Sequence, residues 1–209
     1  MMHAAMTSKV AKRAPGRRNF VRIIGGTWRG RRVNFPDSPG LRPTPDRVRE
    51  TLFNWLKDAV AGSRCLDLFA GSGALGLEAL SRGAREVVFV EQAAAVARAL
   101  RAELVRLGGA ARARVVEAPA ARFLAAPGEP FDVLFLDPPF TLSVLPEYVA
   151  RIDAGSWVKR DGWVYLECER TTGAPALPAH WELVKSKSAG EVGYHLARVA
   201  ARQDSRAGQ

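Results

Sequence analysis

Short apolar runs alternate with helix-like segments between residues 63 and 168, and this alternation restricts the fold more than any other feature. Runs of strand length occupy residues 65–69, 86–90, 113–117, 132–136 and 162–168, with helical patterns near 74–81, 93–107, 120–124 and 145–152. Such alternation predicts right-handed crossovers and a mostly parallel sheet covered by helices on both faces. Residues 181–186 and 192–199 predict an antiparallel hairpin at its edge. The predicted fold class is therefore α/β, with seven strands.

The fourth of these runs ends in the tetrapeptide Asp137-Pro138-Pro139-Phe140. Neither proline can donate a hydrogen bond to a neighbouring strand, so the strand must end at Asp137. Ligands of open α/β sheets bind just beyond the carboxyl ends of strands. A carboxylate, a rigid carbonyl and an aromatic face together suit a flat group that carries an amine. The alternative is a Pro-rich loop that binds nothing.

A glycine-rich loop follows the first run, with the spacing Gly71-x-Gly73-x-x-Gly76. Alone, this pattern is weak evidence for a dinucleotide. Asp67, inside the preceding run, needs an amide or ammonium partner when buried, and it would repel a pyrophosphate. Glu91 ends the second run, where an acidic residue commonly binds ribose hydroxyls. Together they favour S-adenosylmethionine over NAD. The alternatives are a structural role for Asp67 and a solvated strand end at Glu91.

Positive charge is concentrated at the start of the chain. The net charge is +10, and residues 1–32 contain nine Lys or Arg and no Asp or Glu. This balance predicts a polyanionic partner. Residues 1–18 predict a disordered basic tail, with an organelle transit peptide as the alternative.

A β-hairpin is predicted for residues 21–35, because Gly25-Gly26 can form a tight turn between two strand-like runs. Its polar face carries arginines expected to contact RNA: Arg22, Arg29, Arg31 and Arg32. Trp28 lies among them and would either stack on bases or anchor the hairpin.

A helix is predicted from Thr44 to about residue 61. Thr44 is the expected N-cap, with Pro45 at the first helical position. Apolar residues at helical spacing predict a buried stripe, and Arg47 and Arg49 are expected to lie beside it.

Other classes of protein fit the sequence less well. No apolar stretch reaches the length of about 18 residues that suggests a membrane span, and no signal peptide is visible. Cys65 and Cys168 lie in apolar runs and predict buried free thiols, which suits a cytoplasmic protein. With three scattered histidines they predict no metal site. Nothing indicates an obligate oligomer, and a monomer is expected.

These motifs together resemble the class I S-adenosylmethionine-dependent methyltransferases that act on exocyclic amines. The resemblance rests on residues 67–76, Glu91 and residues 137–140. Residues 21–31 and 41–56 are very similar to the bacterial 16S ribosomal RNA guanine-N2 methyltransferases of the small-subunit head. The resemblance covers residues 20–200. It implies a Rossmann-like fold, S-adenosylmethionine as the cofactor, and 16S rRNA, within the small ribosomal subunit, as the partner.

The resemblance also implies roles for individual residues. Expected cofactor contacts are Arg42, Thr44, Asp67, Ala70, Gly71, Gly73, Glu91, Ala118 and Asp137. Expected catalytic residues are Asp137, Pro138 and Phe140, and Arg47 is expected to contact RNA. The sequence departs from the wider pattern after the third run, where many methyltransferases read adenine with Asp or Asn. Here the stretch is Glu117–Ala120, so the backbone of Ala118 or Ala120 is expected to do so.

The predicted reaction is the attack of a guanine N2 amine on the sulfonium methyl. Asp137 and the Pro138 carbonyl would accept the amine protons, while Phe140 stacks on the base flipped out of the RNA. The predicted organisation is a tail (1–18), a hairpin extension for RNA (19–40), a methyltransferase domain (41–202) and a second tail (203–209). The alternatives are a DNA amino-methyltransferase, a non-catalytic nucleic-acid-binding module and an NAD-linked dehydrogenase.

Overall fold

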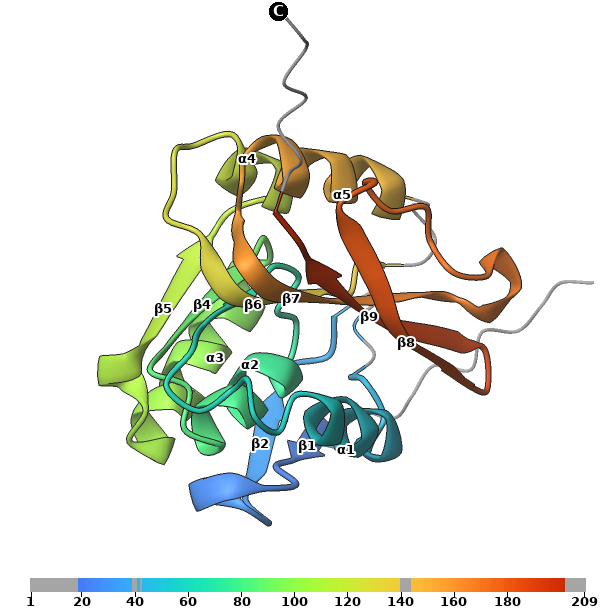
Figure 1. Cartoon of the computed structure of the whole chain (residues 1–209). Coiled ribbons are helices and arrows are strands. Elements are labelled where there is room, and N and C mark those ends of the chain that lie inside the picture. Colours follow the sequence, from blue (N-terminus) through green and yellow to red (C-terminus); the bar gives the residue numbers. More distant parts are fainter. Residues whose placement is uncertain (1–18, 39–40, 42, 140–143, 202–209) are drawn as a thin grey trace, which may run out of the picture.

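A seven-stranded sheet forms the centre of the molecule in the computed structural model, which describes residues 19–38, 41, 43–139 and 144–201 (Figure 1). The strands are β3 (Arg64–Asp67), β4 (Glu86–Glu91), β5 (Ala113–Glu117), β6 (Phe131–Leu136), β7 (Val158–Glu169), β8 (Trp181–Ala189) and β9 (Val192–Val199). Their order is β5-β4-β3-β6-β7-β9-β8. The first five are parallel neighbours, whereas β9 pairs antiparallel with β7 and β8. The predicted α/β fold is confirmed.

Helices cover both faces of this sheet (Figure 1). One face carries α1 (Asp46–Trp55), α2 (Ala74–Ser81) and α3 (Ala94–Leu107), and the other carries α4 (Ala120–Leu124) and α5 (Leu145–Ala154). Within the described residues, short 3-10 helices span Gly26–Trp28, Ala110–Arg112 and Arg170–Thr172. Successive side chains along each central strand point into two different apolar cores, one on each face of the sheet. Cys65 and Phe135 belong to the first core, whereas Leu66 and Leu136 belong to the second. Cys65 and Cys168 are buried free thiols, as expected.

The strand register brings three acidic residues together at the carboxyl ends of neighbouring parallel strands. Asp67 of β3 pairs with Phe135 of β6, and Phe135 pairs in turn with Tyr165 of β7. Side chains two residues apart share a face of a sheet. Asp137 and Glu167 therefore follow at the carboxyl ends of β6 and β7, on the face where Asp67 lies.

The N-terminal hairpin is present, but its turn differs from the prediction. β1 (Asn19–Arg22) and β2 (Arg32–Phe35) form a separate two-stranded antiparallel sheet, joined by residues 23–31. The prediction of a tight turn at Gly25-Gly26 is wrong, because nine residues separate the two strands. A side chain at Gly26 would place its Cβ 1.9 Å from the Ser81 carbonyl oxygen, so this glycine allows the loop to lie against the end of α2.

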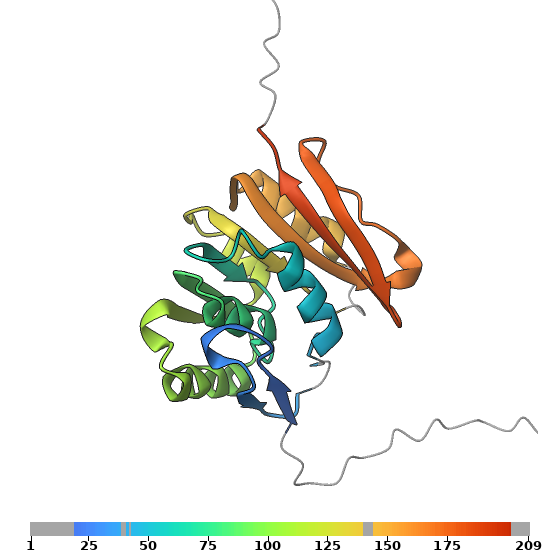
Figure 2. The same ribbon diagram turned by 60° about the horizontal axis from the view of Figure 1, so that its bottom comes forward.

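The hairpin shares the main core. Val21, Ile23, Trp28 and Val33 all belong to the apolar cluster beneath α1, α2 and α3. Figure 2 shows the hairpin, in blue, beside α3. The hairpin is therefore held to the sheet domain by packing as well as by the chain.

Two predictions for α1 are wrong. Thr44 does not cap the helix, because Pro45 occupies the N-cap position and the Thr44 hydroxyl bonds Asp137 instead. Arg49 does not lie beside the buried stripe, because its side chain is fully buried. The helix also ends at Trp55, after which residues 56–62 form turns.

Among the described residues, no helix combines the length and the apolar character needed to cross a bilayer.

Candidate active site

Asp137 lies at the end of β6, directly before the two prolines. Its Oδ2 accepts a hydrogen bond of 3.3 Å from the Thr44 hydroxyl, which comes from the segment before α1. Burial raises the pKa of the Asp137 carboxyl to about 7, and the Thr44 hydrogen bond acts in the opposite direction. Pro138 is buried and Pro139 is exposed. Phe140, the other expected catalytic residue, lies outside the described residues.

Asp67 occupies the end of β3, where it is 2% exposed. Its Oδ2 accepts a hydrogen bond of 2.9 Å from the N–H of Gly76, in the first turn of α2. No side chain of Gly73 can cap this helix, so Asp67 supplies the acceptor from the strand. Burial raises the pKa of Asp67 to about 7, and the Asp137 and Glu91 carboxylates raise it as well. Asp67 therefore has the structural role that was one of its two alternatives, since it holds the start of α2 through the Gly76 N–H.

Glu91 joins two loops at the end of β4. Its Oε2 accepts from the N–H of Gly71 at 2.9 Å, and its Oε1 accepts from the N–H of Ala93 at 2.7 Å. The carboxylate is thus fixed beside the glycine loop rather than freely solvated. Gly73 has φ of +75°, and a Cβ there would lie 2.5 Å from Leu100 Cδ1, so the loop can only close with glycine at this position.

Glu167 of β7 is a site residue that sequence reasoning missed. It is 2% exposed, and its Oε1 accepts a hydrogen bond of 2.8 Å from the Tyr165 hydroxyl. Burial raises the pKa of Glu167 well above its usual value, and the Asp137 carboxylate raises it further. The available signal was the one that identified Asp67: a single carboxylate inside an otherwise apolar strand.

Asp67, Asp137 and Glu167 form an acidic row across the ends of β3, β6 and β7. Each of the three carboxyl groups has a raised pKa, with burial as the largest cause. Their charges also repel one another, since opposing carboxylates raise the pKa values of Asp67 and Glu167. A positive charge placed near the row would relieve both penalties. In the described part of the chain, no three His, Cys, Asp or Glu side chains are grouped as metal ligands.

A buried arginine holds Thr44 in place. Arg49 Nε donates to the Thr44 carbonyl at 3.1 Å, and Nη2 donates to the Arg22 carbonyl at 2.7 Å. Nη2 also bonds Asp46 at 2.6 Å, and Nη1 lies 3.6 Å from Glu78 Oε2. β1 of the hairpin and the segment that precedes α1 therefore share one guanidinium.

Glu78 completes this connection from the side of α2. It is fully buried, and its two oxygens accept from the N–H groups of Ile24 and Gly25 at 2.8 Å. Arg82 Nε donates to Glu78 Oε1 at 2.7 Å. Neither Glu78 nor Arg49 was predicted to take part in a network.

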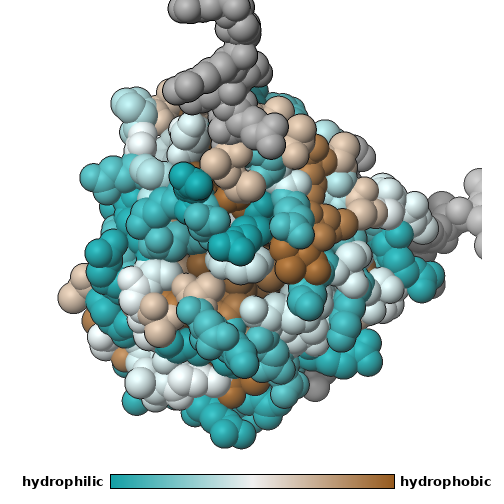
Figure 3. All heavy atoms as spheres, in the orientation of Figure 1, coloured by the Kyte–Doolittle hydropathy of each residue, from teal (hydrophilic) through white to brown (hydrophobic). Residues whose placement is uncertain are grey.

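Most residues expected to contact RNA lie at the surface. The exposed arginines are Arg22, Arg29, Arg31, Arg32 and Arg47. The lower part of the face in Figure 3, over the hairpin, is mainly hydrophilic. Trp28 is different, because it is only 7% exposed and its ring packs against Gly109. The packing alternative is confirmed for Trp28, and stacking of its ring on a base is excluded in this conformation.

Two further expected cofactor contacts, Ala70 and Ala118, are hydrogen-bonded to the end of β4. Ala70 donates its N–H to the Val90 carbonyl at 2.9 Å, which places the loop beside the end of β4. Ala118 donates its N–H to the Glu91 carbonyl at 3.1 Å, so this N–H is already used. Arg42 lies outside the described residues.

Comparisons with known proteins agree on one family. A family model described as "Conserved hypothetical protein 95" matches residues 21–198. Ribosomal RNA small subunit methyltransferase D of Escherichia coli strain K12 is 48% identical over 185 residues, covering 88% of this chain and 93% of the relative. The chain belongs to this family.

Other relatives and structures support the same conclusion. The protein of that name from Haemophilus influenzae is 44% identical and covers 87% of this chain and 95% of its own length. The solved structure of yhhF from Escherichia coli has a TM-score of 0.82 at 44% identity, covering 88% of this chain and all of that one. The family and the Rossmann-like class I methyltransferase fold expected from the sequence are confirmed.

Proposed function

We propose that this methyltransferase transfers the methyl group of S-adenosylmethionine to the exocyclic N2 amine of a guanine in 16S rRNA. The observation that carries the proposal is the Asp137 carboxylate, held by Thr44 directly before a rigid Pro-Pro turn at the end of β6. The relatives named for the small ribosomal subunit support the choice of rRNA. The choice of guanine rests on the resemblance of the sequence motifs alone.

The acidic row fits this cofactor. S-Adenosylmethionine carries an ammonium and a sulfonium, and both would relieve the repulsion among Asp67, Asp137 and Glu167. A pyrophosphate would add negative charge at the same edge. The Glu91 oxygens each have a lone pair beyond the bonds to Gly71 and Ala93, and these would accept from ribose hydroxyls. Since the Ala118 N–H is used, its carbonyl would accept from the adenine amine.

The chain's own groups prepare the amine for reaction. When bound, S-adenosylmethionine would supply a methyl group on a positively charged sulfur, and the C–S bonding pair would remain on sulfur as the amine nitrogen took the methyl. The ionised Asp137 accepts one amine proton as a hydrogen bond, and the Pro138 carbonyl accepts the other. These bonds draw the nitrogen lone pair out of conjugation with the ring and stabilise the charge that develops on nitrogen. Asp137 is then positioned to take the proton that the methylated amine releases. Phe140 is proposed to stack on the guanine.

One assay tests the proposal. The protein is incubated with labelled S-adenosylmethionine and, separately, naked 16S rRNA, small subunits lacking the modification, and DNA. The expected product is N2-methylguanosine in rRNA. A different methylated base, or labelled DNA, would contradict the proposal.

A variant locates the chemistry. Asp137→Asn keeps the size of the side chain but loses the charge, so kcat should fall about 100- to 1,000-fold. Affinity for S-adenosylmethionine, measured by calorimetry, should change only a few fold, because Asp67 and Glu91 remain. Asp58→Asn, at an exposed carboxylate, is the matched control. Near-normal turnover in Asp137→Asn would refute the catalytic assignment.

A further inference from the structure

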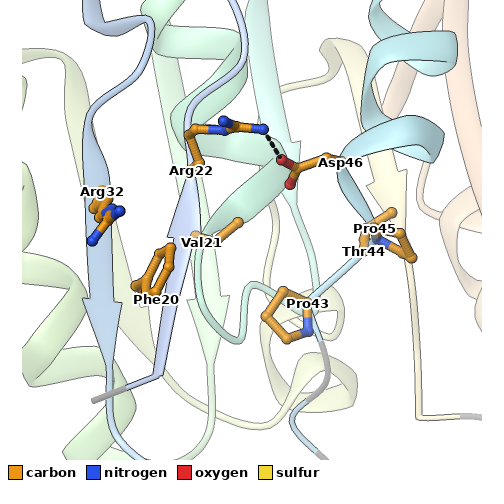
Figure 4. A pocket seen from close by; sticks show the side chains of 8 residues that line it. All are labelled: Phe20, Val21, Arg22, Arg32, Pro43, Thr44, Pro45 and Asp46. Carbon is orange, nitrogen blue, oxygen red and sulfur yellow. Dashed lines mark hydrogen bonds and ion pairs between the residues drawn. The ribbon is translucent and has the colours of Figure 1, made fainter. Parts of the chain in front are cut away.

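A pocket of about 490 Å³ lies between the hairpin and the segment that precedes α1 (Figure 4). Phe20, Val21 and Arg22 of β1 form one wall, and residues 43–46 form the other. Arg22 reaches across to Asp46 at 3.0 Å and links the two walls. Pockets of about 300–1,000 Å³ commonly bind small organic groups, and a nucleobase is of that kind.

Phe20 gives this pocket an aromatic surface. Its side chain is 49% exposed, and among the described residues the other large exposed hydrophobic side chains, Val105 and Leu183, are aliphatic. The Arg32 guanidinium carbon lies 4.6 Å from the centroid of the Phe20 ring. An exposed aromatic ring paired with an arginine is the arrangement on which proteins stack unpaired bases.

The charge at the pocket suits a phosphate. Within the described ranges, Arg32 forms no ion pair with an acidic side chain, so its charge is available to a ligand. Arg22 is paired with Asp46 but keeps 61% of its side chain exposed. Among the described residues that line the pocket, Asp46 is the only acidic one, and it is paired with Arg22 and Arg49.

The pocket adjoins the catalytic turn. Thr44 lines it, and the hydroxyl of the same residue bonds Asp137 at 3.3 Å. A nucleotide in the pocket would thus be close to the base at Asp137. We propose that the pocket binds one unpaired nucleotide next to the target base, with its base stacked on Phe20 and its phosphate held by Arg32. This inference rests on the proposed function, since it requires an RNA substrate.

Binding measurements with a short fluorescent RNA test the inference. The probe is an oligonucleotide of mixed sequence, used unpaired and also annealed to its complement. Phe20→Ala should weaken binding of the unpaired probe about tenfold and leave the duplex unchanged, because a stacked base requires an open strand. Leu183→Ala removes an exposed apolar side chain from β8, an edge strand of the seven-stranded sheet that does not line the pocket, and should change neither affinity.

Stacking itself is read from 2-aminopurine, whose fluorescence is quenched by an aromatic neighbour. Probes that carry it at successive positions should show one position that the wild-type protein quenches and Phe20→Ala does not. Full affinity in Phe20→Ala, or equal losses for unpaired and duplex RNA, would overturn the pocket assignment while rRNA methylation by the wild type continues. Absence of rRNA methylation by the wild type would instead overturn the proposed function, and with it the place of the pocket beside a target base.

Discussion

The acidic row and the basic hairpin use charge in opposite ways. Asp67 and Glu167 are almost fully buried, and burial raises their pKa values, so their environment controls whether they are charged at all. The arginines of the hairpin are exposed, and their charges are screened by salt. A buried charge is therefore sensitive to pH and to a bound cation, whereas an exposed one is sensitive to ionic strength and to a polyanion.

Arg49 is the point where these two regions meet. Its guanidinium is buried, as the acidic row is, but it is positively charged, as the hairpin is. It donates hydrogen bonds to the backbone carbonyls of both Arg22 and Thr44. Movement of the hairpin would therefore reach Thr44, and through it Asp137, by direct hydrogen bonds. The comparison can be tested by changing the junction, then the acidic row, and then the hairpin.

Arg49→Met should have the largest effect. The substitution leaves the Thr44 and Arg22 carbonyls without their donor and leaves Glu78 with Arg82 as its one remaining cation among the described residues, so the free energy of unfolding should fall by about 3–5 kcal/mol. Urea unfolding at pH 7 measures it. Arg47→Met, at an exposed position of the same helix, should change stability by no more than about 0.5 kcal/mol. A loss below about 1 kcal/mol for Arg49→Met would show that the two regions are held together by packing alone.

Asp67→Asn should change how stability depends on pH. The native pKa of about 7 lies above the usual value of 3.8, so between these values the native state holds a proton that the unfolded chain has lost. The free energy of unfolding therefore falls as pH rises through this interval. Asn still accepts from the Gly76 N–H but cannot ionise, so from pH 4 to pH 8 the variant should gain about 4 kcal/mol relative to the wild type.

Unfolding curves across this range, with Asp58→Asn as the exposed control, measure the difference. Parallel stability profiles for wild type and Asp67→Asn would mean that Asp67 stays ionised in the fold, and that the acidic row does not need a cation.

Site residues could be predicted from the sequence where a local motif marks the end of a strand. Asp137, Glu91 and Asp67 lie at the ends of recognisable strands beside local motifs, so their place at one edge of the sheet followed from topology. Glu167 has no motif around it, and its contact with the row depends on β7 lying next to β6.

Arg49 was misplaced for a different reason. Its position matches the spacing of Leu52, Phe53 and Leu56, which are buried on the same side of α1. The helical period places Arg49 inward, and a charged side chain can occupy such a position only where buried partners satisfy it. Its partners, Glu78 and the Arg22 carbonyl, are distant in sequence and could not have been paired with it from spacing.

Thr44→Val should have a smaller effect, on the pH dependence of catalysis. Asp137 must be ionised to accept the amine proton, so kcat/KM for S-adenosylmethionine, which reflects the free enzyme, should rise with pH through about 7. The Thr44 hydroxyl lowers the Asp137 pKa, so its loss should move the midpoint upward by about 0.5 to 1 pH unit. A pH–rate profile measures the shift, and Thr51→Val, whose hydroxyl only bonds the Arg47 carbonyl in α1, should leave the profile unchanged. A downward shift in Thr44→Val would show that the hydroxyl does not stabilise the ionised form.

The double variant Arg29→Gln, Arg31→Gln should have the smallest effect, because it removes exposed charge only. RNA affinity at moderate salt should fall a few fold, and the slope of log K against log salt should become shallower by about two. Arg160→Gln provides the control, since its exposed side chain lies at the amino end of β7, away from the hairpin. If Arg160→Gln reduces the slope, for each charge removed, as much as the double variant does, RNA binding responds to the net charge of the whole molecule. If only the hairpin changes do so, the hairpin is where the phosphates lie, and exposed charge in this protein acts locally despite its screening.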